Sequence, residues 1–289
     1  MNPAETPTPT LQEFLDSWDL FRDPVITGML AGVLLGYLGV YIVLRRTVFV
    51  SAAVSQASAL GVSLVFLLDM YEWIPHALAE PVAGALVCAL LAMGFFTFNP
   101  ERMRLTREGL LGLGYLFGSA GAVMAGDRIT QEAHDIQAVL FGPGVVVREL
   151  DFHLTIVTTV LLMGAHLLLK RGLVFTSFDE ESARVQGLPV RALNLFLFLS
   201  IGVAVAVTTH AIGALSVFAF SVLPAMTALA LSGRMNVVFI LAPLLGMVAG
   251  GGGYLFAFFL RFPVGGSQTF LACVMCGLAM ASAVIRRRT

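Results

Sequence analysis

Long apolar runs, each close to 20 residues, recur along the whole chain, and most charged residues fall between them. An apolar helix of about 20 residues spans a hydrocarbon core about 30 Å thick. The runs show no period-two alternation, which argues against a transmembrane β-barrel. The fold class we expect is all-α: a polytopic membrane helix bundle of about nine transmembrane helices. The predicted spans are 24–44, 48–69, 80–98, 109–126, 152–169, 190–208, 212–231, 236–258 and 266–285.

The composition agrees with a membrane protein. Hydrophobic residues make up 58% of the chain and charged residues only 12%, and the mean hydropathy is +0.89. Soluble domains carry charge on roughly a quarter of their residues. The net charge of −1 provides no bulk basic surface, so the lipid bilayer is an expected partner and nucleic acid is not.

Charge also predicts the orientation. With the C-terminal arginines in the cytoplasm, nine spans place most of the 17 Lys and Arg residues inside, among them Arg45 and Arg46. The positive-inside rule favours that arrangement over its reverse. We therefore expect the N-terminus outside and the C-terminus in the cytoplasm, with the sixth and seventh spans joined by a tight outside turn near Thr209 and His210.

The segment ahead of the first span is acidic and has no basic start or apolar core, so it does not resemble a signal peptide. Within it, apolar residues recur at helical spacing, which predicts a short amphipathic helix lying on the membrane surface. We divide the chain into an extracytoplasmic amphipathic segment, 1–23, and a transmembrane domain, 24–289. The apolar face comprises Leu11, Phe14, Leu15, Trp18 and Phe21.

Small residues predict close helix contacts. Gly32 and Gly36 form a G-x-x-x-G pair on the first span, and Gly246 and Gly250 repeat that spacing on the eighth. Such pairs let membrane helices approach closely. In the outside connection 127–151, the sequence "IQAVLFGPGVVV" is apolar but too short to span, which favours a re-entrant or surface half-helix.

A short helix is predicted in the cytoplasmic segment between the fifth and sixth spans, at about 177–187. Ser177 and Glu180 have the spacing of a capping box, with Ser177 as the N-cap. Gly187 stands where a left-handed C-cap is needed, and Pro189 prevents continuation. So short a helix is marginal alone, so it must pack on its own membrane domain or on a cytoplasmic partner.

The sequence of this helix, "FDEESARVQG", resembles the coupling helix in permease subunits of ABC importers for divalent metals such as zinc, manganese and iron. Phe178, Asp179, Glu181, Ala183 and Gly187 are in register with that family's pattern. Glu180 replaces a proline of the pattern. The resemblance implies that these five residues couple the permease to its ATPase.

Other stretches match the same family in order, over about residues 24–285. "GALSVFAFSVLPAMTALAL" resembles its seventh-span sequence, and "YLGVYIVLRRTVFVSAAVSQASALGVSLVFLL" resembles its first two spans. "IQAVLFGPGVVV" resembles the family's segment after the fourth span.

The resemblance implies a permease that moves metal ions by alternating access in the bacterial inner membrane. It implies three protein partners: a second copy of the chain in a homodimer, a cytoplasmic ABC ATPase and an extracytoplasmic substrate-binding protein. The phosphate-loop pattern G-x-x-x-x-G-K-[ST] requires a glycine directly before its lysine. The one lysine of this chain, Lys170, follows Leu169, so the chain has no phosphate loop. We therefore expect a transport subunit rather than an enzyme. It has no cofactor of its own, and the partner ATPase uses ATP and Mg²⁺.

The second span departs from the family pattern. The family commonly has an aspartate and, four residues later, a histidine, where this chain has Ala52 and Gln56. An amide offers a neutral oxygen, which binds Zn²⁺ less well than His or Cys. The metal ligands are therefore unknown. The candidates for the translocation path are Ser51, Ala52, Ser55, Gln56 and His210.

Several interpretations stay open at this point. One is a metal permease with a weakened or relocated site, and another is a permease of the same fold for a non-metal substrate or for export. The serines and Gln56 could instead serve helix packing, since Ser51, Ser55 and Ser58 share a face. A membrane scaffold or sensor that transports nothing is a further alternative.

Overall fold

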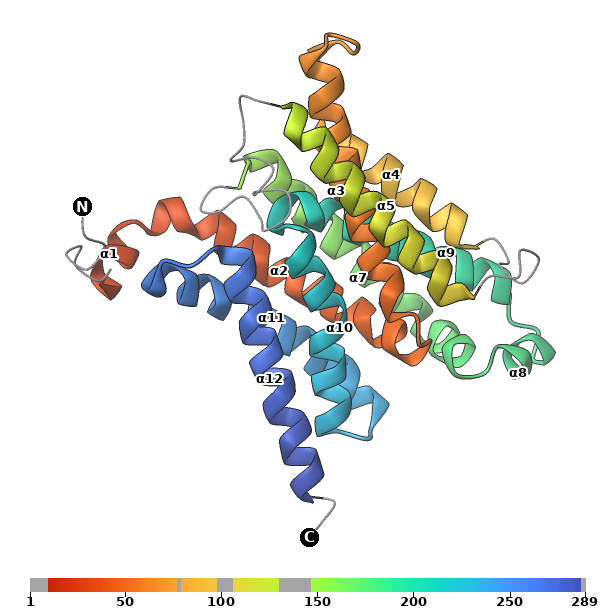
Figure 1. The fold of residues 1–289 in the computed structure, drawn as a ribbon. Helices are drawn as coiled ribbons and strands as arrows, with labels where there is room; N and C mark the ends of the chain where they lie inside the picture. The colour runs from red at the N-terminus through yellow and green to blue at the C-terminus, as the bar shows by residue number, and fades with distance from the viewer. Residues whose placement is uncertain (1–9, 77–78, 98–105, 130–146, 287–289) are drawn as a thin grey trace.

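The computed structural model describes residues 10–286 except 77–78, 98–105 and 130–146. The described residues are helical apart from short connections, and they contain no strand, so the all-α prediction is confirmed (Figure 1). The helices are α1 (Leu11–Asp16), α2 (Trp18–Leu44), α3 (Val48–Met70), α4 (Pro81–Thr97), α5 (Arg107–Arg128), α7 (Glu149–Phe178), α8 (Glu180–Val185), α9 (Val190–Ile212), α10 (Ala214–Leu231), α11 (Met235–Leu260) and α12 (Val264–Arg286).

The predicted spans coincide with the long helices. Eight described helices are long and apolar enough to cross a membrane. The predicted span 80–98 corresponds to α4, which has 17 residues and is therefore about 26 Å long, close to the lower limit for spanning. The predicted half-helix in "IQAVLFGPGVVV" lies outside the described residues.

Two boundaries differ from prediction. The fifth span was expected to end at 169, but α7 continues to Phe178, so the helix passes through Lys170 and Arg171. The turn expected near Thr209 and His210 lies instead at Gly213, whose φ of 87° ends α9 and starts α10. A positive φ suits glycine because it has no β-carbon, so the chain turns at the glycine and His210 remains helical.

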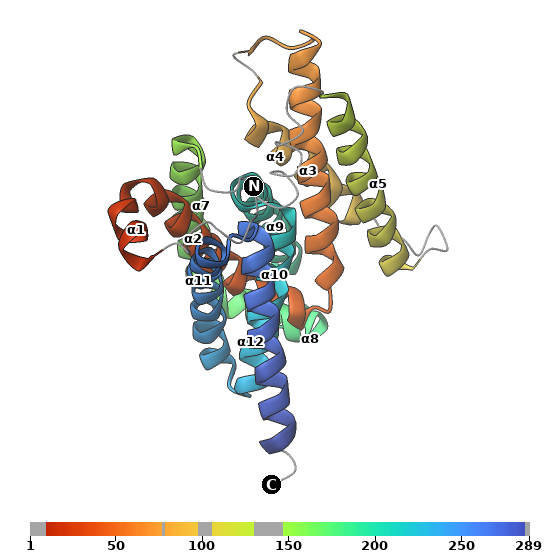
Figure 2. The same cartoon turned by 60° about the vertical axis from the view of Figure 1, so that its left-hand side comes forward.

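The closest packing in the bundle joins α2 to α11, which lie side by side in Figures 1 and 2. A β-carbon built on Gly32 would fall on the backbone carbonyl of Gly246, and one built on Gly250 would fall on that of Gly28. One side chain, Gln268 of α12, also donates a hydrogen bond to the Gly250 carbonyl at 3.1 Å. Each G-x-x-x-G pair therefore contacts the helix that carries the other pair.

A second group of helices is assembled around α3. Gly61 of α3 and Gly84 of α4 face each other so closely that a β-carbon on either would meet the other's carbonyl. Gly118 of α5 lies against the backbone of Gln56. Figure 2 shows α3, α4 and α5 together on one side of the molecule, while α12 extends from the other.

The N-terminal segment packs on the protein itself. Thr10 caps α1 and forms a capping box with Glu13. Phe14 and Phe21 are buried against Phe258 of α11, with ring centroids 5.0 and 5.1 Å away. Leu15 and Trp18, from the same predicted apolar face, point outward. The helix α2 already begins at Trp18, so the boundary drawn between residues 23 and 24 falls inside it.

We predict that Gly246→Ala destabilises the protein markedly, because the added β-carbon meets the backbone of Gly32, which cannot move without separating α2 from α11. Overpacking typically costs about 1–3 kcal/mol. The measurement is the melting temperature of purified protein in detergent. Gly277→Ala is the control, since a β-carbon there meets nothing within 4 Å. Equal melting temperatures for the two variants would contradict the close contact.

Candidate coupling helix and membrane path

The short helix α8 is capped by Asp179. Its carboxylate accepts a hydrogen bond from the Ser182 backbone amide at 2.9 Å and another from the Ser182 hydroxyl. These hydrogen bonds hold the pKa of the Asp179 carboxyl below its ordinary value. The predicted cap at Ser177 is wrong: Ser177 lies in the last turn of α7, where its hydroxyl donates to the Leu173 carbonyl. Because α7 continues to Phe178, the first available cap is Asp179.

The end of α8 follows the prediction. Gly187 has a φ of 79°, and its amide donates to the Arg184 carbonyl at 3.1 Å. The next amide, on Leu188, donates to the Ala183 carbonyl at 3.1 Å. These bonds close the helix after six residues, less than the two turns expected.

The helix α8 is seated by one face and exposed on the other. Ala183 is fully buried against the bundle, whereas Phe178 is 58% exposed and Val185 85% exposed. The carboxylates Asp179 and Glu181 are also exposed. The exposed face of α8 and the residue before it therefore combine apolar and acidic side chains.

In α3, the serine hydroxyls bond to their own helix. Ser51, Ser55 and Ser58 are buried, and each donates to a carbonyl three or four residues earlier at 2.9 Å. Such bonds satisfy a hydroxyl without a partner on another helix. The structure therefore shows no free hydroxyl donor along this face of α3.

Gln56 differs from the serines. Its side chain is largely buried, and its amide oxygen Oε1 has no hydrogen-bond partner among the described residues. Ala52, one turn earlier, is buried and offers no ligand atom. A buried acceptor without a partner costs free energy. On α3, Gln56 is therefore the predicted path residue whose side-chain oxygen is still available to bind a ligand.

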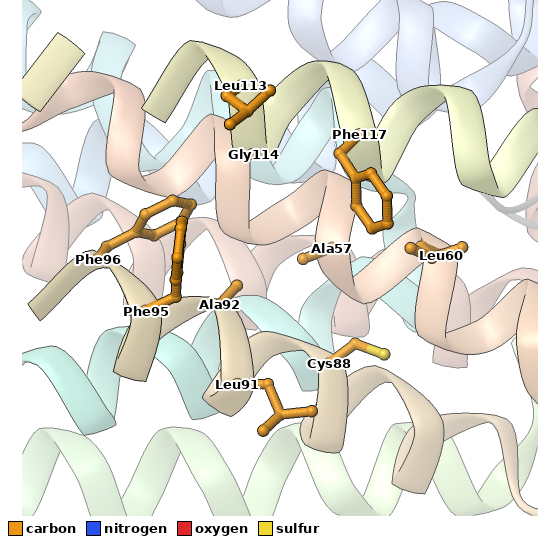
Figure 3. Close-up of a pocket in the computed structure, with 11 residues that line it drawn as sticks. Ala57, Leu60, Cys88, Leu91, Ala92, Phe95, Phe96, Leu113, Gly114 and Phe117 are labelled. Atoms are coloured by element: carbon orange, nitrogen blue, oxygen red, sulfur yellow. The ribbon is translucent and has the colours of Figure 1, made fainter. Parts of the chain in front are cut away.

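An apolar hollow of about 400 Å³ opens beside Gln56, between α3, α4 and α5. Figure 3 shows Ala57 and Leu60 of α3 facing Cys88 of α4 and Phe117 of α5 across it. The lining is almost entirely apolar. Apart from the Cys88 thiol, the side chains that line this hollow offer no metal ligand.

His210 belongs to a charged cluster at the far end of α9. Its Nδ1 lies 3.1 Å from Oδ1 of Asp151, which is buried in the first turn of α7. Arg148 donates to both oxygens of Asp151, at 2.9 and 3.1 Å, and to Glu80 at 3.2 Å. The cluster fastens the ends of α4, α7 and α9. The structure thus brings Ser51, Ala52, Ser55 and Gln56 together on α3 and places His210 in a separate contact with Asp151.

Sequence reasoning missed Asp151. The sequence nevertheless contained a signal, because Asp151 stands directly before the fifth predicted span and His210 just after the end of the sixth. Consecutive spans are antiparallel, so these two positions lie at the same end of the bundle. His166 is fully buried between Tyr37, Tyr41 and Phe196, and its Nε2 lies 2.7 Å from the Ser200 hydroxyl.

No group of three or more His, Cys, Asp or Glu side chains that could hold a metal ion exists among the described residues. A single copy of the described chain therefore presents no complete metal centre. What it presents is a multi-spanning helix bundle with a short capped helix exposed at one end.

Comparison with known proteins identifies the class. Residues 17–283 match the ABC 3 transport family, and the chain belongs to that family. It is therefore a transport permease subunit, as the resemblance of its coupling-helix and span motifs predicts.

Its relatives include manganese transporters. The chain is 24% identical over 268 residues to "Manganese transport system membrane protein MntC" of Listeria monocytogenes, covering 92% of each chain. It is 26% identical over 259 residues to "Manganese import system permease protein ScaB" of Streptococcus parasanguinis, covering 88% of this chain and 89% of the relative.

Solved structures share the fold. The chain is similar to a chain of PsaBC from Streptococcus pneumoniae in complex with Fab, with a TM-score of 0.80 and 22% identity, covering 93% of this chain and 95% of that one. It is also similar to a metal-chelate type ABC transporter in an inward-facing conformation, with a TM-score of 0.65 and 15% identity, covering 91% and 87%.

We predict that Asp151→Asn lowers stability by about 1.5–3 kcal/mol, since the charged acceptor shared by Arg148 and His210 is lost. The measurement is again the melting temperature in detergent. Glu149→Gln removes the same charge two residues earlier from an exposed side chain and should have little effect. If both variants have the melting temperature of the wild type, the cluster does not hold these helix ends together.

Proposed function

We propose that this chain forms the membrane path of an ABC importer for divalent metal ions, with manganese, zinc and iron(II) as the candidate substrates. The observation that carries the proposal is the family match over nearly the whole chain, combined with the exposed face of α8. The names of the manganese-transporting relatives support the choice of substrate class. Metal ions move by alternating access, and the energy comes from ATP hydrolysed by another chain.

The proposal includes partners that meet the chain at its two ends. A cytoplasmic ATPase, which uses ATP and Mg²⁺, receives the exposed face of α8: Phe178, Asp179 and Glu181, with Ala183 and Gly187 fixing the helix. A second copy of the chain completes the path, and a substrate-binding protein delivers metal outside. This arrangement places the C-terminus in the cytoplasm and the N-terminus outside a bacterial plasma membrane, in keeping with the distribution of arginines.

The path itself follows α3. Gln56 offers a buried oxygen that has no hydrogen-bond partner among the described residues, and a homodimer would present two such oxygens. Neutral oxygens suit Mn²⁺ better than they suit Zn²⁺, which prefers nitrogen and sulfur. The path candidates Ser51, Ala52 and Ser55 lie on the same helix. His210 lies on α9, at the outer end of the proposed path.

A second candidate function is a permease of the same fold for a non-metal substrate or for export. Two observations favour it: Ala52 and Gln56 replace the usual ligands, and no cluster of three or more His, Cys, Asp or Glu side chains occurs among the described residues.

We predict that the chain, reconstituted in vesicles with its ATPase and binding protein, shows ATP hydrolysis stimulated by Mn²⁺, and that ⁵⁴Mn accumulates in the vesicles. Zn²⁺ and Fe²⁺ are tested in parallel. A complex lacking the ATPase is the control and should not accumulate metal. Stimulation by another solute, with no response to any of the three metals, would favour the second candidate function.

We also predict that Gln56→Leu lowers the metal transport rate about tenfold, because a ligand oxygen worth roughly 1.4 kcal/mol or more is lost. Basal ATP hydrolysis should be unchanged. The matched control is Ser58→Ala, whose hydroxyl bonds only to the Val54 carbonyl of its own helix and which should transport normally. Unchanged transport in Gln56→Leu would exclude this residue from the path.

A further inference from the structure

Arg45, the C-cap residue of α2, joins three segments of the chain through its guanidinium group. Its Nε donates to the Ser177 hydroxyl at 2.9 Å, and its Nη1 donates to Oδ1 of Asn194 at 2.8 Å. Its Nη2 donates to the Thr176 hydroxyl at 3.3 Å. The guanidinium also lies over the Phe198 ring, 5.9 Å from the centroid.

The partners of Arg45 flank the coupling helix on both sides. Thr176 and Ser177 belong to the last turn of α7, immediately before α8. Asn194 lies in the second turn of α9, which follows α8 after the connection 186–189. One side chain therefore holds both the entry and the exit of the segment that carries α8.

The two hydroxyls are already placed to accept. Thr176 donates to the Gly172 carbonyl at 3.0 Å, and Ser177 donates to the Leu173 carbonyl at 2.6 Å. Each hydroxyl thus uses its proton within α7 and leaves its lone pairs for Arg45. A guanidinium presents its donors in a rigid planar fork, so it can hold three acceptors at fixed angles, which a lysine ammonium cannot do.

Through Arg45 these contacts reach the centre of the bundle. The helix α2 is the one whose glycines lie against α11, and Gly39 of α2 lies against the backbone of Ser221 in α10. A displacement of the segment around α8 would therefore be passed to α2 and, through backbone contacts that cannot be compressed, to α10 and α11.

We propose that Arg45 is the positioning residue that transmits movement of the coupling helix to the transmembrane core. This inference rests on the proposed function, in which an ATPase moves α8. Arg45 touches neither the ATPase nor the substrate in this role; it acts by keeping both ends of the α8 segment attached to α2.

The test is Arg45→Lys in the full complex reconstituted with ATPase and binding protein. We expect metal transported per ATP hydrolysed to fall at least about fivefold, the lower end of typical coupling effects. Assembly with the ATPase and basal hydrolysis should be retained. Arg46→Lys is the matched control, because Arg46 is the next residue and its side chain is exposed. It should keep the wild-type ratio.

Asn194→Leu provides an independent variant, since it removes the acceptor on the α9 side and leaves Arg45 and the α7 contacts in place. We expect the same loss of coupling at a wild-type melting temperature. Normal transport per ATP in either variant would overturn the role of Arg45 while leaving the proposed function intact. A wild-type complex that neither hydrolyses ATP nor accumulates any tested metal overturns the proposed function itself.

Discussion

The contact of α2 with α11 is the constraint on which the rest of the bundle depends. Inside a bilayer, lipid tails are as apolar as the helix surfaces, so helices associate through close packing rather than through the hydrophobic effect. Gly28 and Gly32 on one helix meet Gly250 and Gly246 on the other with backbone against backbone. The hydrogen bond from Gln268 to the Gly250 carbonyl attaches α12 to the same contact. The pair forms a dense unit against which α1, α10 and α7 pack.

Two polar clusters lie at opposite ends of the bundle. At one end, Arg45 binds the residues that flank α8. At the other, Arg148 and His210 converge on the buried carboxylate of Asp151. Between the two ends, the path candidate Gln56 lies on α3, in the group of α3, α4 and α5. This division suits alternating access, since the bundle can move as packed groups joined by few polar contacts.

Much of this architecture could be predicted from the sequence. The nine apolar runs give the long helices, and Gly187 with Pro189 gives the end of α8, because these signals are local in the chain. The predicted start of α8 was wrong. Serine is a common N-cap residue, but Ser177 still belongs to α7, which ends only at Phe178. The glycine pairs predicted close approach but could not reveal that they meet each other. The three hydrogen-bond partners of Arg45 are at least 131 residues away along the chain, and no local pattern records them.

Because Arg45 attaches both ends of the segment that carries α8 to α2, we expect that segment and the α2–α11 unit to move as one body. Spin labels at Leu195 in α9 and Ile240 in α11, both exposed, would measure this directly in the assembled complex. The distance distribution between the labels should be the same in nucleotide-free and nucleotide-trapped complexes. A shift of the distribution between these two states, in a complex shown to transport metal, would contradict the claim.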